Sequence, residues 1–112
     1  MSYAHICKRL INKPIGPSST AYTIVEVGEN CLFQPTQKTG WLSLPVELVG
    51  EWLKGIETGA IDLSMNAREM RDVIKIRSHW AAQMHSFETH LRAVCIGAVE
   101  NGLITPGIQI ND

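Results

Sequence analysis

The sequence predicts an α+β fold in one domain, residues 1–112, with a small antiparallel sheet of three or four strands packed on two or three helices. Three observations predict it. Residues 22–44 hold short runs of β-branched and aromatic residues separated by turn residues, which is typical of a strand meander. On both sides of this segment, apolar residues recur at three- and four-residue steps, as in amphipathic helices. A chain of 112 residues has the length of one domain.

The N-terminal residues predict a short helix. Ser2 can cap a helix over residues 3–11, in which the apolar side chains form one stripe. Pro14 stops this helix, because the residue before a proline is pushed out of the helical region. Residues 14–20 contain two prolines, a glycine and two serines, so we interpret them as a connector.

A meander follows the connector. Strands are expected at three places: 22–27, 31–34 and 41–44. Residues 28–30 tolerate positive φ and predict a tight hairpin turn. The first strand does not alternate cleanly, since Ile24 shares a face with Glu26 while Val25 shares the other with Thr23. We interpret this pattern as a sheet that is covered partly on both sides.

The C-terminal half predicts two further helices. Pro45 suits the first turn of a helix that continues to Gly59. Residues 66–99 then form the longest predicted helix. Nine positions from Met70 to Ala98, spaced alternately by three and four residues, lie on one side of this helix within a sector of about 100° around its axis. Eight of these nine residues are apolar. This helix is therefore expected to contribute the largest apolar surface of the protein.

The length of this helix raises a question of packing. It opens at a capping box of Asn66 and Glu69, and Gly102 follows its end as a left-handed residue. A straight helix over this segment would span roughly 50 Å, whereas a globule of this size is roughly 30–35 Å across. The helix therefore either bends once near residues 77–79 or overhangs and packs against a second copy. The tail at 103–110 is expected to form a strand on a sheet edge.

Composition and charge narrow the class of protein. The net charge of −1 creates no strong overall field toward nucleic acid or anionic lipid. The three cysteines are an odd number without C-x-x-C spacing, so we expect reduced thiols and neither a disulfide framework nor a zinc knuckle. The chain shows no signal peptide and no run of 18 apolar residues, which predicts a cytoplasmic protein with no membrane partner. No metal and no other cofactor is expected.

Two charged residues in the apolar sector suggest a homodimer. Arg77 and Glu88 both fall in this sector, where an unpaired charge is unfavourable. They are roughly 16 Å apart along one helix and cannot meet. In an antiparallel pair of helices, Arg77 would face Glu88 of the second copy. The expected interface consists of Arg77, Trp80, Ala81, Met84, Phe87 and Glu88. Alternatively, Arg77 marks the bend and Glu88 pairs with Arg92 one turn later.

A basic helix face suggests a second function. Four residues cluster opposite the apolar row: Arg68, Arg71, Lys75 and His79. A basic face that follows a helix and a short link resembles in outline a helix pair placed on DNA. A solvated helix face has the same pattern, and the link from Ile56 to Met65 is longer than the turn of a helix-turn-helix. Nucleic-acid binding is therefore an alternative function to homodimerisation through the long helix.

Aromatic and methionine residues suggest a third function. A small-molecule pocket would be lined by Trp41, Trp52, Trp80 and Met84. The alternative is that these side chains close the core between the sheet and the long helix.

Motifs for catalysis and for metal binding are weak. The chain has no G-x-S-x-G elbow and no glycine-rich phosphate loop. Cys31, beside the hairpin turn, is the cysteine expected to be accessible, whereas Cys7 and Cys95 lie on apolar stripes. His85 shares a helix face with Glu88, but two ligands do not make a metal site. The sequence therefore favours a non-enzymatic binding or interaction module, homodimeric through the long helix, over an enzyme.

Overall fold

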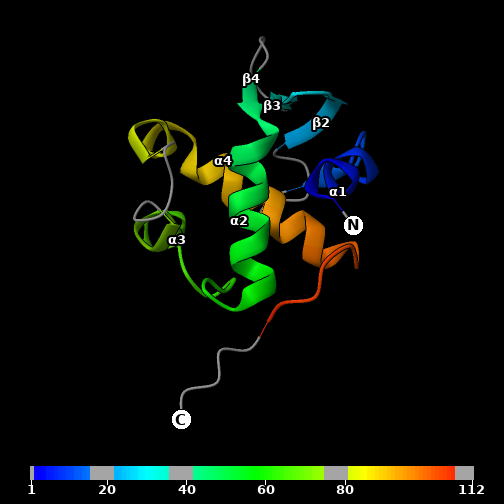
Figure 1. Cartoon of the computed structure of the whole chain (residues 1–112). Helices are drawn as coiled ribbons and strands as arrows, with labels where there is room; N and C mark the ends of the chain where they lie inside the picture. The colour runs from blue at the N-terminus through cyan, green and yellow to red at the C-terminus, as the bar shows by residue number, and fades with distance from the viewer. Residues whose placement is uncertain (1, 16–21, 36–41, 75–80, 108–112) are drawn as a thin grey trace.

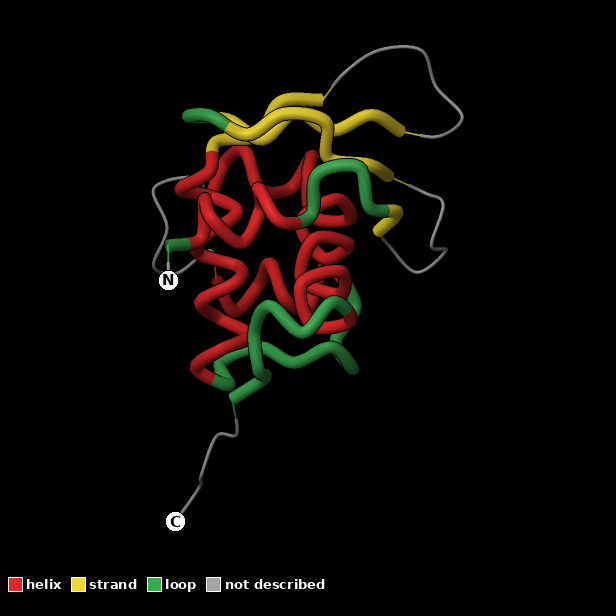
Figure 2. Tube along the Cα trace, turned by 90° about the vertical axis from the view of Figure 1, so that its right-hand side faces the viewer, coloured by secondary structure: helices red, strands yellow, loops and turns green. Residues whose placement is uncertain are grey.

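The computed structural model describes residues 2–15, 22–35, 42–74 and 81–107, and it confirms the α+β fold. In chain order the elements are α1 (Tyr3–Arg9), β1 (Pro14–Ile15), β2 (Tyr22–Val27), β3 (Asn30–Pro35), β4 (Leu42–Pro45), α2 (Val46–Thr58), α3 (Ala67–Ile74) and α4 (Ala81–Glu100). The strands lie together at one end of the molecule, and the helices pack on one face of the sheet (Figures 1 and 2). Sheet and helices are thus segregated, as the sequence predicts.

The sheet is an antiparallel meander in the order β1-β2-β3-β4. One of its two edge strands, β1, comes from the segment that is predicted above to be a connector. The predicted strand in the C-terminal tail is wrong for the described part of that tail, since residues 103–107 have no strand structure. The tail instead crosses the end of α2, where the amide of Gly107 donates to the carbonyl of Ile56 at 2.9 Å. Residues 108–110 lie outside the described residues.

A β-bulge explains the uneven alternation in β2. Ile24 pairs with Phe33 and Val27 pairs with Cys31, with a register shift between Ile24 and Glu26. The extra residue places both Ile24 and Val27 on the core side, because directly paired residues share a face. Three residues of the opposite face are exposed: Glu26, Gln34 and Ser43. Thr23 and Leu32, which share this face, are half-buried, so the described strands do not contradict the prediction of partial cover on both sides.

The predicted caps bound α1 and α2, although α1 ends at Arg9, two residues before the predicted end at residue 11. The Ser2 hydroxyl accepts a hydrogen bond from the amide of His5 at 3.2 Å and caps α1. α2 ends at Gly59, which has a φ of 80° and takes the left-handed conformation that favours glycine. Pro45 is the last residue of β4 and directly precedes α2. Strand and helix therefore join without a loop.

The long predicted helix forms two helices, α3 and α4, that pack against each other (Figure 1). The capping box is confirmed: the amide of Glu69 donates to the side chain of Asn66 at 2.9 Å, and the amide of Asn66 donates to the Glu69 carboxylate at 3.2 Å. The predicted stop is also confirmed, since Gly102 has a φ of 70° and the amide of Leu103 donates to the carbonyl of Ala98. The predicted bend at residues 77–79 lies outside the described residues.

The core lies around the second half of α4. From Leu91 to Ala98, every residue except Arg92 is buried. α4 can approach β1 closely because Gly97 has no side chain: a Cβ there would lie 2.5 Å from Cγ2 of Ile15. Among the described helices, none has the length and apolar character needed to cross a lipid bilayer.

Candidate ligand pocket between α2 and α3

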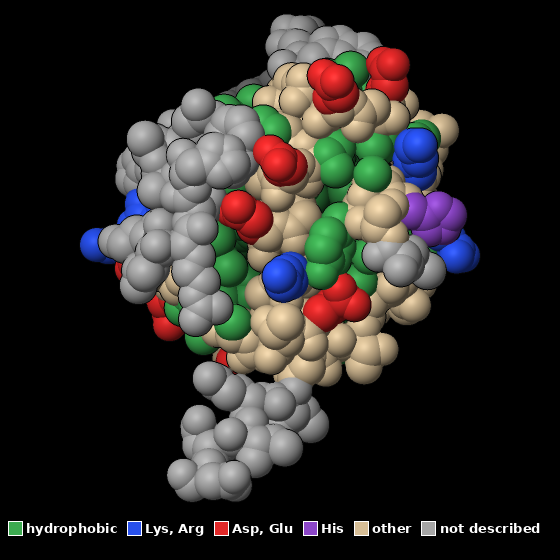
Figure 3. Space-filling model, viewed as in Figure 1, with side chains coloured by type: hydrophobic (Ala, Val, Ile, Leu, Met, Phe, Trp, Pro, Cys, Tyr) green, Lys and Arg blue, Asp and Glu red, His purple; other side chains and the backbone are tan. Residues whose placement is uncertain are grey.

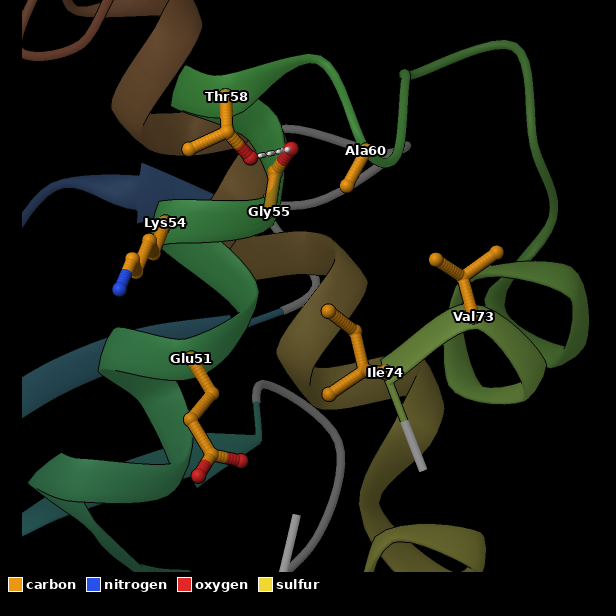
Figure 4. A pocket seen from close by; sticks show the side chains of 7 residues that line it. All are labelled: Glu51, Lys54, Gly55, Thr58, Ala60, Val73 and Ile74. Atoms are coloured by element: carbon orange, nitrogen blue, oxygen red, sulfur yellow. Dashed lines mark hydrogen bonds between the residues drawn. The ribbon is translucent and has the colours of Figure 1, made fainter. Parts of the chain in front are cut away.

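A cavity of about 330 Å³ lies between the C-terminal half of α2 and the end of α3 (Figure 4). Its described lining consists of Glu51, Lys54, Gly55, Thr58, Ala60, Val73 and Ile74. α2 and the residues that follow it supply the polar groups, and α3 supplies two aliphatic side chains. A volume of this size is at the low end of the range of small-molecule sites.

Close packing at a glycine sets the width of this pocket. A Cβ at Gly55 would lie 2.9 Å from Ile61 and 3.0 Å from Ile74. Gly55 therefore lets the Ile74 side chain reach α2, and Figure 4 shows Ile74 extending toward that helix. The carbonyl of Gly55 accepts from the amide of Ile61 at 3.1 Å and from the hydroxyl of Thr58 at 3.4 Å. The backbone of this wall is thus already hydrogen-bonded.

Two sets of polar contacts hold the α3 wall in place. The Arg92 guanidinium on α4 donates to the carbonyls of Met65 at 2.9 Å and Leu63 at 3.1 Å, in the link before α3. Further along α3, Nε of Arg71 lies 3.4 Å from a carboxylate oxygen of Glu88 on α4. Both contacts connect α3 to the buried helix and not to α2, so the gap between α2 and α3 depends on α4.

The link between α2 and α3 contains a local turn at Asp62. Its carboxylate accepts hydrogen bonds from the amide and the hydroxyl of Ser64. These hydrogen bonds lower the pKa of the Asp62 carboxyl, because they stabilise its charged form. The turn brings the chain from the end of α2 to the capping box of α3.

One carboxylate oxygen in the pocket wall has no partner. Oε2 of Glu51 is buried and makes no hydrogen bond. Lys54, one turn further along α2, is exposed, and Figure 4 shows its side chain directed away from α3. A buried carboxylate oxygen without a donor is unfavourable, because burial removes the hydrogen bonds that it would make with water. It is the feature of this pocket that indicates binding.

A second, more open hollow of about 410 Å³ lies between α1 and α2. The ring of Tyr3 packs on Gly50, where a Cβ would lie 3.1 Å from the ring. Burial, together with the nearby Glu57 carboxylate, raises the pKa of Tyr3 to about 12. Figure 3 shows acidic and hydrophobic side chains together over α2 on this side of the molecule.

Of the four residues of the predicted aromatic pocket, the structure describes the side chain of Trp52, and Trp52 does not belong to the described lining of the observed pocket. Trp52 belongs to α2 but is fully buried in the core, and its indole Nε1 has no hydrogen-bond partner. Trp41 and Trp80 lie outside the described residues, and Met84 belongs to the first turns of α4, whose side chains are outside the described set. The observed pocket lies on the α3-facing side of α2.

Residues of the predicted dimer interface fall into two groups. Phe87 is half-buried and packs on the core of its own chain, and Glu88 pairs with Arg71. The alternative pairing of Glu88 with Arg92 is not the one observed. Arg77 and Trp80 lie outside the described residues, as does the side chain of Ala81. The structure thus supplies Glu88 with an ion pair inside one chain, which removes the need for a second copy at that position.

The predicted basic face is divided in the structure. Arg68 is exposed on α3, whereas the side chain of Arg71 is only 15% exposed and points to Glu88. Lys75 and His79 lie outside the described residues.

The three cysteines are all fully buried, so the predicted accessibility of Cys31 is wrong. The thiols of Cys7 and Cys31 are within hydrogen-bond reach, and this contact together with burial raises the pKa of Cys31. Burial likewise raises the pKa of Cys95. Among the residues that the structure describes, no three histidine, cysteine or acidic side chains converge as a metal-ligand set.

Sequence reasoning missed the observed pocket. None of the described lining residues belongs to a site that the sequence analysis proposes. A glycine inside the helical pattern, Gly55, was the available signal, because such a glycine often marks a close approach of two elements.

Comparisons with protein-family models, with curated proteins and with solved structures each found no match to this chain.

Proposed function

We propose that the protein is a non-enzymatic domain that binds a small molecule in the pocket between α2 and α3. The observation that carries this proposal is the unpartnered Oε2 of Glu51 in the wall of a cavity of about 330 Å³. Apolar side chains on the α3 wall and a few placed polar groups on the α2 wall match the usual composition of a ligand site. A catalytic role is not supported, because the described lining has no nucleophile placed beside a base.

The test is a fragment titration followed through the methyl NMR signals of Val73 and Ile74. We expect saturable shifts of these two signals with at least one class of fragment. Ala60→Leu should block the shifts, since the larger side chain fills the cavity. Ala67→Leu is the matched control, because Ala67 lies on α3 but not in the pocket lining. Titrations in which no fragment at millimolar concentration moves either signal would refute the proposal.

Homodimerisation through α4 and nucleic-acid binding by the basic face stay proposals that rest mainly on residues outside the described ranges. A dimer predicts a concentration-dependent mass in sedimentation. Nucleic-acid binding predicts an affinity that falls steeply with salt, because each phosphate contact releases counterions. Of the predicted basic residues, Arg68 is the exposed one that the structure describes.

A further inference from the structure

We propose that the pocket selects a small organic cation, a protonated amine on a short apolar body, with Glu51 as its counter-ion. This inference rests on the proposed function of the same pocket and names the class of ligand.

The lining presents an acceptor that needs a donor. Oε2 of Glu51 is buried without a hydrogen-bond partner, so a bound N–H group would replace the water that this oxygen has lost. A charged donor satisfies a carboxylate better than a neutral one, because the hydrogen bond is then charge-assisted. An ammonium group is therefore the best match to this oxygen.

Among the described lining groups, donors are already in use or directed elsewhere. The hydroxyl of Thr58 donates to the carbonyl of Gly55, and the ammonium of Lys54 points away from α3 (Figure 4). An anionic ligand would thus meet the Glu51 carboxylate without a compensating donor from the pocket. The negative charge of Glu51 therefore disfavours an anionic ligand and favours a cationic one.

The position of the pocket on α2 adds to this preference. Gly55, Thr58 and Ala60 lie at or just beyond the C-terminal end of the helix, where the helix dipole is negative. The last turn of α2 has no basic residue to complement that end. α2 carries three acidic residues, Glu47, Glu51 and Glu57, against one basic residue, Lys54, so the helix has a net negative charge.

The aliphatic side chains of α3 determine the size and polarity of the uncharged part of the ligand. Val73 and Ile74 are half-buried and aliphatic, and Ala60 continues this surface on the other side. A short alkyl chain or one ring would bury apolar area there. A volume of about 330 Å³ suits a monoamine of this size better than a nucleotide.

The experiment compares three probes of the same shape and different charge: n-hexylammonium, n-hexanol and n-hexanoate. Each is titrated into the full chain at pH 7 and followed through the Val73 and Ile74 methyl signals. We expect saturable binding of n-hexylammonium, weaker binding of the alcohol and no binding of the carboxylate. Glu51→Gln keeps the shape of the side chain and should lower the affinity for the ammonium by about ten- to a hundredfold.

Two matched variants separate local charge from net charge. Glu47→Gln makes the same charge change one turn earlier on α2, outside this pocket, and should leave the affinity within about twofold. It also tests the hollow between α1 and α2, which Glu47 lines and where binding would respond to it. Lys54→Met should leave ammonium binding unchanged or make it tighter.

Each remaining outcome overturns a different statement. Equal binding of all three probes, unaffected by Glu51→Gln but blocked by Ala60→Leu, would keep the pocket as a binding site and refute its preference for cations. Preference for n-hexanoate, lost in Lys54→Met, would reverse the charge of the ligand. If no probe moves the Val73 and Ile74 signals and fragments of other classes also fail, the proposed function itself is wrong.

Discussion

α3 and the second half of α4 come from one heptad-patterned stretch, yet the structure buries them to very different extents. α3 has one buried residue, Met70, and its other apolar side chains are half-buried. In α4, the run from Leu91 to Ala98 is buried except at Arg92. The same apolar spacing thus produces a central helix in one place and a covering helix in the other.

The comparison teaches that periodicity predicts which side of a helix faces the core, but not how many sides are covered. α4 crosses α2 (Figure 1) and packs against α1, α2, α3 and β1, so its flanks are buried along with its apolar row. α3 packs against α4 and touches α2 at the pocket, which leaves one flank open. A ligand site can form beside α3 because that helix does not have to fill the core.

The largest expected difference between the two helices concerns truncation of valine. Val94→Ala should lower the free energy of unfolding by about 2 kcal/mol, because it opens a cavity among fully buried neighbours. Val73→Ala on α3 should cost less than about 1 kcal/mol, since that side chain is half-buried and lines a cavity already. Urea unfolding of both variants measures the contrast, and equal losses would contradict it.

The next largest effect is expected at Arg92 of α4, whose guanidinium is hydrogen-bonded to the link before α3. Arg92→Met keeps the length of the side chain but loses both hydrogen bonds to the carbonyls of Met65 and Leu63, and should cost about 2 kcal/mol. Arg68→Met, an exposed change on α3, is the control and should stay within about 0.5 kcal/mol. A similar loss in both variants, again measured by urea unfolding, would mean that charge and not these contacts is responsible.

A smaller effect is expected at the start of α3. Asn66→Ala removes the side-chain cap from the amide of Glu69 and should destabilise the protein by about 1 kcal/mol. Hydrogen exchange should speed up in α3 and stay slow in the buried half of α4, because the cap acts only on the first turn. Uniform acceleration across both helices would show that they open as one unit.

The smallest expected effect concerns Tyr3, which belongs to α1 and lies outside the two helices compared above. The pKa of Tyr3 is raised to about 12 in the folded protein, whereas an ordinary tyrosine ionises near 10. The folded state holds this proton more tightly, so the contribution is complete below pH 10 and is lost as the pH rises toward 12. Tyr3→Phe should remove this part of the alkaline loss of stability, measured by unfolding between pH 9 and 12. An unchanged profile would show that the hydroxyl does not contribute.

Local signals predicted the ends of the elements well. The hydroxyl of Ser2, the capping box of Asn66 and Glu69, and the left-handed glycines Gly59 and Gly102 act over three or four residues, so their effect can be read from neighbouring positions. The strands of the meander were predicted for the same reason. The bulge in β2 was not, because an irregular alternation has the same appearance as coverage on two faces.

The site depended on contacts between distant residues. Glu51 becomes a pocket residue only because α3 returns beside α2, and Glu88 finds Arg71 only because residues 66–99 form two helices. The pairing of Pro14 and Ile15 with β2 likewise needs the hairpin in place. None of these partners lies within one turn of the residue concerned, so periodicity and capping carry no information about them.

The sequence by itself determined the fold class, the meander of β2, β3 and β4 between helices, and most of the helix caps, since those depend on propensity, caps and spacing along the chain. Only the tertiary structure decided which helix is central, where a cavity is left and which charges meet. Burial and ion pairing are properties of surfaces brought together across the molecule, and they appear only when the helices have packed.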